Sequence, residues 1–233
     1  ENRIGRRNAP GLFNLRWRRF FHWDGGVLGL KGQAINPLTH PDEMGSTLAL
    51  VLERLEQHPT YRRAFEHIYK ESKIETWMLL DALLQFTGAL ISNQSFYDKV
   101  QAGAYRFSPQ QEKGARLFQH HCATCHRPPL FETDQFQTNF IDTFPSDLGR
   151  FEITGKPKDR YRFRVPSLRN VTHTYPYMHD GRYRTLKEVL AHYGKQLELA
   201  ETDQKDLIAF LKTLTDTSFL LNKRFQFQSL TLP

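Results

Sequence analysis

The residues with the clearest chemistry are two cysteines and a histidine in the motif Cys122-Ala123-Thr124-Cys125-His126. The spacing Cys-x-x-Cys-His is the attachment pattern of c-type haem. Two thiols one helical turn apart can add to the two vinyl groups of one porphyrin, and the adjacent histidine then lies under the iron as an axial ligand. The motif therefore predicts one covalently bound haem c.

Two other uses of the cysteine pair stay open as alternatives. A structural zinc site takes four ligands, and the chain has only these two cysteines and no second Cys-x-x-Cys pair. A thioredoxin-like dithiol follows an apolar strand, whereas a capped and charged helix precedes Cys122. Haem is therefore the favoured interpretation.

The periodicity of apolar residues predicts a mainly α-helical protein with little β structure. Residues 1–45 lack a sustained helical period and are expected to be irregular. The helix over residues 74–91 is apolar enough that we expect it to be largely buried. Six clear helices are predicted. The first follows a Ser46 cap, the second begins at Pro59, the third covers 74–91, and the fourth follows a Ser108 cap with Gln111 at its third position. The last two follow caps at Thr185 and Thr202, and a short strand is predicted over 160–165.

The helix that leads into the cysteines carries a second cytochrome signature. Gly114 and Phe118 lie four residues apart on it, and Phe210-Leu211 lie on the last clear helix. In c-type cytochromes a first helix with glycine and an aromatic residue crosses a last helix with an aromatic residue, and the glycine permits close approach. Residues 108–216 therefore predict one complete cytochrome c-like domain.

The net charge of +7 is concentrated in two arginine-rich stretches, residues 1–22 and 150–169, each with a local charge of +5. Aromatic residues are interleaved with the arginines, which is also seen in nucleic-acid-binding proteins. Arginine pairs with carboxylates equally well, so nucleic-acid binding is not favoured. No uninterrupted apolar run is long enough for a transmembrane helix.

Further motifs follow one another in a recognisable order. The C-terminal half holds Phe-Arg-Val-Pro-Ser-Leu-Arg-Asn-Val at 163–171, Thr-Tyr-Pro-Tyr-Met-His-Asp-Gly at 174–181 and Thr-Leu-Lys-Glu-Val at 185–189. The N-terminal half holds Arg7-Asn8-Ala9-Pro10, Trp23-Asp24-Gly25 and the series Gln33, Pro37, Pro41, Glu43, Met44. Over most of residues 3–216 this order resembles the bacterial di-haem cytochrome c peroxidase and MauG family. The resemblance implies two cytochrome c-like helical domains with long irregular loops, which we place at 1–95 and 96–233.

The resemblance implies roles for residues around the C-terminal haem. His126 would be the proximal ligand of the electron-relaying haem. The sixth ligand in this family comes from the helix after the His-Asp-Gly turn, as methionine in typical peroxidases and tyrosine in MauG-like members. Tyr193 lies fourteen residues beyond His179 and matches that position, with Met178 as the alternative axial ligand and His192 as a more remote one.

In the N-terminal half the resemblance implies the peroxide-binding side. Trp23 matches a tryptophan between two haems that serves as an electron relay. Gln33, Pro37 and Glu43 match residues on the distal side of the peroxide-binding haem. Glu43 would move a proton from one peroxide oxygen to the other, which requires a carboxylate within hydrogen-bond reach of peroxide.

The resemblance also implies a calcium site between the domains. Asn8 would supply a side-chain oxygen, and Thr174 and Pro176 would supply backbone oxygens. Oxygen ligands suit this hard cation.

The family needs two Cys-x-x-Cys-His motifs, and these 233 residues contain a single one, at 122–126. We expect the second haem to be attached upstream of Glu1, with a one-haem relative as the alternative. The implied function is a hydrogen peroxide-dependent di-haem oxidoreductase in which electrons pass between the C-terminal haem and a peroxide-binding haem. A Tyr193 ligand would favour MauG-like substrate oxidation. The alternative function is a single-haem electron-transfer protein without peroxidase activity.

Partners and location follow from the same resemblance. Besides hydrogen peroxide, it implies a redox partner, either a small cytochrome or cupredoxin donor or a protein substrate, and a homodimer as one assembly. Covalent attachment of haem c implies an exported bacterial protein, with the periplasm as its location.

Overall fold

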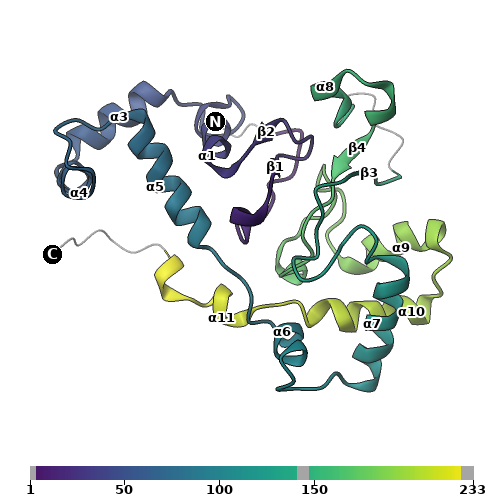
Figure 1. The fold of residues 1–233 in the computed structure, drawn as a ribbon. Coiled ribbons are helices and arrows are strands. Elements are labelled where there is room, and N and C mark those ends of the chain that lie inside the picture. Colours follow the sequence, from purple (N-terminus) through teal and green to yellow (C-terminus); the bar gives the residue numbers. More distant parts are fainter. Residues whose placement is uncertain (1–3, 141–146, 227–233) are drawn as a thin grey trace.

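The computed structural model describes residues 4–140 and 147–226, and it shows two groups of helices joined by irregular chain (Figure 1). The predicted mainly helical class is confirmed, since the described strands form only two small two-stranded sheets. The outer ends of the predicted domains lie outside the described residues, and the boundary between them stays a prediction. One group holds α3 (Leu48–Gln57), α4 (Pro59–Tyr69) and α5 (Thr76–Ala89), and the other holds α7 (Pro109–His121), α9 (Leu186–Leu197) and α10 (Glu201–Lys212).

The N-terminal stretch is more ordered than the sequence predicts. A short antiparallel hairpin joins β1 (Phe20–Phe21) to β2 (Val27–Leu28). Gly25 turns the chain between these strands with φ +69°, a backbone conformation that glycine adopts without steric cost. Strands of two residues leave no periodic pattern for sequence analysis to detect. The neighbouring elements are η1 (Leu15–Trp17), α1 (Leu30–Gln33) and α2 (Ile35–Thr39).

The predicted helices from 48 and from Pro59 are present as α3 and α4, but the cap of α3 differs from the expectation. Thr47, not Ser46, precedes the helix, and its Oγ1 accepts a hydrogen bond from Leu50 N at 3.1 Å. Thr47 has the extended backbone (φ −118°, ψ 151°) that lets a side-chain oxygen reach the first turn.

The expectation that the apolar helix α5 is largely buried is wrong. Within α5 only Met78 and Leu79 are buried, while Trp77 and Phe86 are half exposed. The helix packs against η1, α1 and α3, which cover part of its circumference. The apolar surface of α5 is therefore larger than the part that its described neighbours cover.

In the C-terminal group, α7 and α10 cross at Gly114. A Cβ atom at this position would lie 2.0 Å from the carbonyl oxygen of Asp206 and 2.9 Å from Phe210 Cβ. Glycine is therefore required for the helix backbones to approach this closely. The crossing predicted from Gly114, Phe118 and Phe210 is present.

The hydrophobic core of this group surrounds that crossing. Phe118, Phe131 and Phe210 are each at most 2 % exposed, and their rings lie 5.0–6.4 Å apart. Leu207 and Leu214 are fully buried beside them. Aromatic packing fixes where the chain following the cysteine motif can lie.

Capping explains where the helices of this group begin. Ser108 with Gln111 forms the capping box that the sequence predicts. The predicted Thr185 cap is also present, and the structure extends it to a capping box with Glu188. The predicted Thr202 cap is wrong, because α10 begins at Glu201 after Ala200, which has no capping side chain. Acidic residues in the first turn favour that end of the helix instead.

Short elements connect the helices. A short capped helix lies between α5 and α7, and the predicted strand over 160–165 is present as the shorter β4. These elements are α6 (Phe96–Gln101), β3 (Phe136–Thr138) paired antiparallel with β4 (Arg162–Arg164), α8 (Phe151–Thr154), η2 (Pro157–Asp159), η3 (Val171–His173), α11 (Thr217–Leu220) and η4 (Lys223–Phe225).

A buried polar network ties the N-terminal stretch to the C-terminal group. Asn14 exchanges two hydrogen bonds of 2.9 Å with the backbone of Ser92. Asn170 donates to Ser92 Oγ at 3.0 Å and accepts from Asp216 N at 2.8 Å. All four residues are at most 2 % exposed, so each bond has little competition from water.

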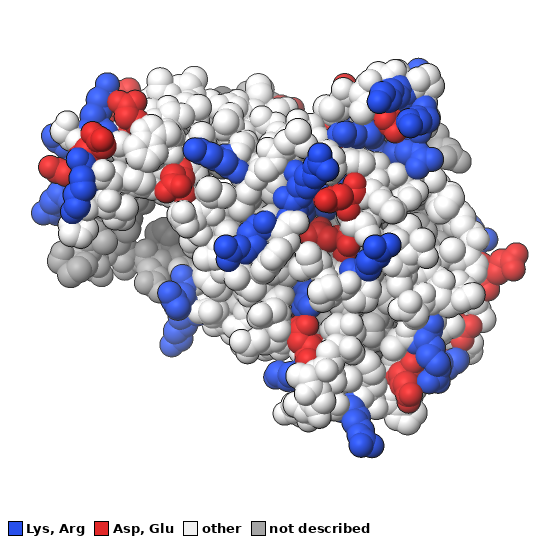
Figure 2. Space-filling model, viewed as in Figure 1, with Lys and Arg blue, Asp and Glu red and all other residues white. Residues whose placement is uncertain are grey.

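The second arginine-rich stretch divides between surface and interior. Figure 2 shows basic side chains gathered over the α8 region, where Lys156, Lys158 and Arg160 are exposed. Arg164 and Arg169 of the same stretch are 2 % exposed. Among the described residues, no helix has the length and apolar character to cross a membrane.

Replacing Gly114 tests the helix crossing. Gly114→Ala is expected to lower the free energy of unfolding by about 1–3 kcal/mol, because the added methyl meets backbone atoms of α10. Gly88→Ala in α5 is the matched control, since its Cβ would have Leu30 Cδ2 at 3.8 Å as its nearest neighbour. The control is expected to be stabilising by about 0.5–1 kcal/mol. Equal effects of the two variants in urea unfolding would contradict the close crossing.

Candidate functional site

The cysteine motif forms a tight turn at the end of α7. Cys125 N and His126 N both donate to Cys122 O, at 3.1 and 2.8 Å. Neither thiol is in a disulfide. Burial raises the pKa of Cys122 to about 12 and also raises that of Cys125. Neutral thiols of this kind are poor redox nucleophiles, which disfavours the dithiol alternative.

The zinc alternative also loses support. Among residues 4–140 and 147–226, no group of three or more histidine, cysteine or acidic side chains is placed to hold a metal ion. A structural zinc site takes four such ligands.

His126 is prepared to bind a metal through one nitrogen only. Its Nδ1 lies 3.0 Å from Pro166 O and 3.2 Å from Phe131 O. Because both partners are acceptors, Nδ1 carries the proton and Nε2 keeps its lone pair. Burial lowers the pKa of His126, although the two carbonyls raise it, so the imidazole stays neutral at pH 7.

This arrangement fits the group that the sequence predicts. A metal-ligating histidine commonly donates its other ring N–H to a backbone carbonyl, which fixes its tautomer and orientation. Cys122 and Cys125 would hold the porphyrin edge, and His126 Nε2 would hold the iron. The donor set and the carbonyl contacts at Nδ1 therefore suit haem c.

Tyr193 on α9 is the first candidate for the sixth ligand. Burial raises the pKa of its phenol, and the nearby thiol groups of Cys125 and Cys122 raise it further. Tyr193 therefore lies within electrostatic reach of the cysteine pair. Its ring packs edge-on against Phe140 at 6.4 Å.

The two alternatives to Tyr193 have different surroundings. Met178 lies in a turn with φ 72°, where its carbonyl accepts from Gly181 N at 3.3 Å. Both ring nitrogens of His192 have hydrogen-bond partners, since Nε2 lies 2.7 Å from Asn139 O and Nδ1 lies 3.3 Å from the Tyr183 hydroxyl. His192 is therefore engaged elsewhere.

Trp23 is buried where the two halves meet. Its indole nitrogen donates to Asn8 O, and its own carbonyl accepts from Arg164 N, both at 2.7 Å. Trp23 therefore links the N-terminal segment to β4 of the C-terminal group.

The predicted calcium ligands are partly brought together. Asn8 Nδ2 lies 2.6 Å from Pro176 O, and Asn8 N donates to His179 O at 2.7 Å. Thr174 lies two residues before Pro176 at the end of η3, with its Oγ1 3.4 Å from Val171 O.

The predicted distal residues lie on successive short elements. Gln33 ends α1, and Pro37 is in α2. Glu43 is exposed in the following turn, which Met44 N closes by donating to Pro37 O at 3.1 Å.

His22 is a neighbour of this region that sequence reasoning missed. Burial lowers the pKa of His22, and the charges of Asp24 and Glu43 oppose that shift. Its Nε2 is buried without a hydrogen-bond partner among the described residues. Its position directly before Trp23 was the only signal available in the sequence.

An ion-pair cluster holds the N-terminal segment against the chain before α8. The Arg7 guanidinium donates twice to Asp147, at 2.7 Å each, and also pairs with Asp24. Burial would raise the pKa of Asp147, but the hydrogen bonds from Arg7 and Gly149 lower it.

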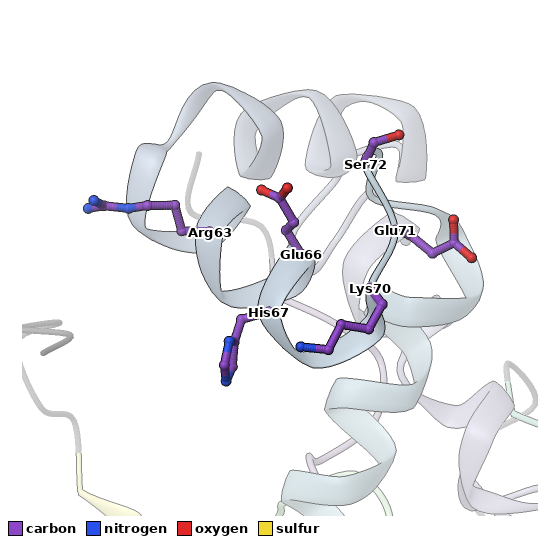
Figure 3. Close-up of a pocket in the computed structure, with 6 residues that line it drawn as sticks. All are labelled: Arg63, Glu66, His67, Lys70, Glu71 and Ser72. Atoms are coloured by element: carbon purple, nitrogen blue, oxygen red, sulfur yellow. The ribbon is translucent and has the colours of Figure 1, made fainter.

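A surface pocket on the other group of helices is separate from the cysteine site. It lies at the C-terminal end of α4, and Figure 3 shows its side chains projecting in several directions. It is lined by Arg63, Glu66, His67, Lys70, Glu71 and Ser72.

Comparison with family models identifies both halves of the chain. The model described as di-haem cytochrome c peroxidase matches residues 1–106. The model described as cytochrome c matches residues 111–215.

Curated relatives agree with these matches. The chain is 34 % identical over 227 residues to the methylamine utilization protein MauG of Methylorubrum extorquens, covering 89 % of this chain and 64 % of the relative. It is 33 % identical over 218 residues to the cytochrome c551 peroxidase of Nitrosomonas europaea, covering 89 % and 65 %. With the MauG protein of Methylophilus methylotrophus it shares 31 % identity over 228 residues, covering 89 % and 68 %. The chain thus spans somewhat less than two thirds of the first two relatives.

Solved structures share the fold. A MauG-like protein associated with microbial copper homeostasis superimposes with a TM-score of 0.85 at 29 % identity, covering 95 % of this chain and 79 % of that one. A diheme peroxidase from Burkholderia thailandensis gives a TM-score of 0.80 at 21 % identity, covering 94 % and 74 %. The second likeness concerns the fold alone.

The Arg7–Asp147 pair predicts a pH-dependent contribution to stability. A carboxylate whose pKa is lowered by folding stabilises the protein above its unfolded pKa, about 4, and loses that contribution as pH falls through the folded pKa. Asp147→Asn is expected to lower the free energy of unfolding by about 1.5–3 kcal/mol at pH 6. The difference from the unmodified protein should shrink below about pH 4.

Urea unfolding of the holoprotein at several pH values measures this effect. Glu71→Gln, an exposed carboxylate after α4, is the control and should change stability by less than about 0.5 kcal/mol. A constant Asp147→Asn effect from pH 6 to pH 3 would contradict the assignment.

Proposed function

Because the chain belongs to the bacterial di-haem cytochrome c peroxidase and MauG family, we propose that it works in a hydrogen peroxide-dependent c-type haem oxidoreductase. The observation that carries this function is His126, whose Nδ1 is fixed by two carbonyls while Nε2 remains available beside two cysteines. The family matches on both sides of residue 106 support a role for both halves of the chain.

Haem held by Cys122, Cys125 and His126 would supply an iron that changes its oxidation state. The chain's contribution is to hold His126 neutral and correctly oriented. The carbonyls of Phe131 and Pro166 accept its Nδ1 proton and increase the electron density at Nε2.

Tyr193 is proposed as the second axial ligand of this haem. Its electrostatic coupling to Cys122 and Cys125 supports the assignment, and so does the involvement of His192 in other hydrogen bonds. Tyrosine in place of methionine favours a lower haem potential, which suits MauG-like oxidation of a substrate.

Trp23 is proposed as an electron relay between the halves. The Trp23 indole N–H donates to Asn8 O, and the Trp23 carbonyl accepts from Arg164 N. Together these two hydrogen bonds keep the ring fixed. A fixed aromatic ring at this junction is suited to carry an electron without reorganising its surroundings.

Gln33, Pro37 and Glu43 are proposed to form the peroxide side. Glu43 is exposed, so small molecules can reach its carboxylate, as the role of a general acid–base group requires. The Pro37 carbonyl holds the turn that carries it. The second haem that these residues would serve needs thiols other than Cys122 and Cys125.

Calcium is proposed to bind near Asn8, Thr174 and Pro176. The approach of the Asn8 side-chain amide to Pro176 O supports a shared position for two of the three ligands. Such a cation would reinforce the contact between the N-terminal segment and the chain before α9.

A redox partner and a periplasmic location complete the proposal. The exposed basic residues over α8 would favour encounter with an acidic donor or protein substrate (Figure 2). The homodimer stays a prediction from the family resemblance.

A second candidate function is single-haem electron transfer without peroxide chemistry. The single Cys-x-x-Cys-His motif among the 233 residues favours it. Two haems per chain and steady-state peroxide turnover in the purified holoprotein would exclude this alternative, whereas one haem and no turnover would exclude the first proposal.

Replacing Tyr193 tests the sixth ligand. Tyr193→Phe in the holoprotein is expected to remove the tyrosinate signature from the visible and electron paramagnetic resonance spectra of the low-spin haem, because the hydroxyl is lost and the ring is kept. Tyr183→Phe is the matched control and should leave those spectra unchanged. A native spectrum for Tyr193→Phe together with an altered one for Met178→Leu would assign the ligand to methionine instead.

Replacing Glu43 tests peroxide activation. Glu43→Gln is expected to lower the rate constant for reaction with hydrogen peroxide by about 10²–10⁴-fold, as loss of a general acid–base group does. Stopped-flow absorbance measures the rate, and the haem content should be unchanged. Glu53→Gln on the exposed side of α3 is the control. Native rates in both variants would remove Glu43 from the mechanism.

A further inference from the structure

Two arginines and one glutamate are buried together behind the His126 loop. Arg18 Nη2 lies 2.8 Å and Arg164 Nη1 lies 3.1 Å from the same oxygen of Glu132, Oε2. The three side chains are 6 %, 2 % and 7 % exposed for Arg18, Arg164 and Glu132. We call this group the Arg18–Glu132–Arg164 cluster.

The charges of the cluster do not balance. Two guanidinium groups share one carboxylate, so the buried cluster carries a net charge of +1. Burial and the neighbouring charge of Arg18 lower the pKa of Arg164 to about 10, although Glu132 and Asp134 oppose that shift. An uncompensated buried charge is costly, and a further anion would offset that cost.

Its hydrogen bonds are also incomplete. Arg164 Nε, Glu132 Oε1 and Thr133 Oγ1 are all buried without a hydrogen-bond partner among the described residues. Buried polar atoms in native proteins nearly always have partners. Three such atoms on adjoining residues point to an additional polar ligand.

The cluster borders the haem site through its backbone. Glu132 directly follows Phe131, and Arg164 precedes Pro166 by two residues, while the carbonyls of Phe131 and Pro166 hold His126. Arg164 N also donates to Trp23 O. The backbone that carries the cluster is therefore continuous with the residues that hold the proposed iron ligand and is bonded to the backbone of the proposed relay.

We propose that the Arg18–Glu132–Arg164 cluster is a buried anion subsite that receives a propionate carboxylate of haem. Guanidinium groups bind carboxylates through paired N–H donors, and the carboxylate would neutralise the spare charge. Arg164 would be the principal donor, because its Nε is buried without a partner. Thr133 Oγ1 would add a neutral donor beside it.

The carboxylate has two possible sources, the haem at Cys122 and Cys125 or a second haem across Trp23. The inference rests on haem attachment and not on the proposed peroxide activity. Its test therefore reads the haem directly, so that a failed peroxide assay and a failed anion subsite remain distinguishable.

The test compares Arg164→Gln with Arg160→Gln, an exposed arginine of the same stretch. In the holoprotein, Arg164→Gln is expected to shift the propionate bending band in the resonance Raman spectrum. It should also lower the midpoint potential of the same haem, because loss of a nearby cation favours the ferric state. Arg160→Gln should change neither. The haem whose band and potential shift, low-spin or high-spin, identifies the source of the carboxylate.

A folded Arg164→Gln variant with native propionate bands and native potentials for every haem would overturn the proposal. If Arg164→Gln does not fold or load haem, Arg164→Lys carries the test, because it keeps the charge and loses the paired donors. A shifted propionate band with a nearly native potential is then expected. A native band in the lysine variant would show that the cluster serves the fold alone.

Discussion

The orientation of the proposed iron ligand depends on the Nδ1–H of His126, which is shared between two backbone carbonyls. Those carbonyls belong to Phe131 and Pro166, which are far apart in sequence from each other. Phe131 is fully buried against Phe118 and Phe210, so the aromatic core at the α7–α10 crossing sets the position of one acceptor. The second acceptor follows β4. Packing of apolar side chains thereby fixes the tautomer and direction of His126, on which iron ligation depends.

Polar contacts join the two halves. Asn14 bonds the backbone of Ser92, and Arg7 is held by Asp147 and Asp24. Trp23 donates to Asn8 O in the N-terminal segment, and its carbonyl accepts from Arg164 N in the C-terminal half. Directional hydrogen bonds in a buried setting fix relative orientation more narrowly than apolar contact does. The relay proposed for Trp23 would need such a fixed orientation.

Local signals in the sequence predicted many of the helices and the haem motif. The capping box at Ser108, the cap at Thr185 and the glycine at the helix crossing are present as expected, because each depends on residues within one turn or on one steric requirement. The caps at Ser46 and Thr202 were wrong by one or two residues. Thr47 next to Ser46 caps the first helix, and the second begins after Ala200 without any side-chain cap. The burial of α5 was overestimated, because apolar composition does not specify how much of a helix its neighbours cover.

For the site, the sequence by itself determined which chemical groups are available: the thiols and imidazole that can hold haem c, a carboxylate and an amide proposed for a peroxide side, and the candidates for the sixth ligand. The tertiary structure alone decided which atoms meet. It directed Nδ1 of His126 to two carbonyls and engaged both nitrogens of His192 elsewhere. It also buried Arg18 and Arg164 around a single carboxylate. The reason is that spacing along a chain constrains neighbours within a few residues, whereas contacts between distant residues depend on how the whole core packs.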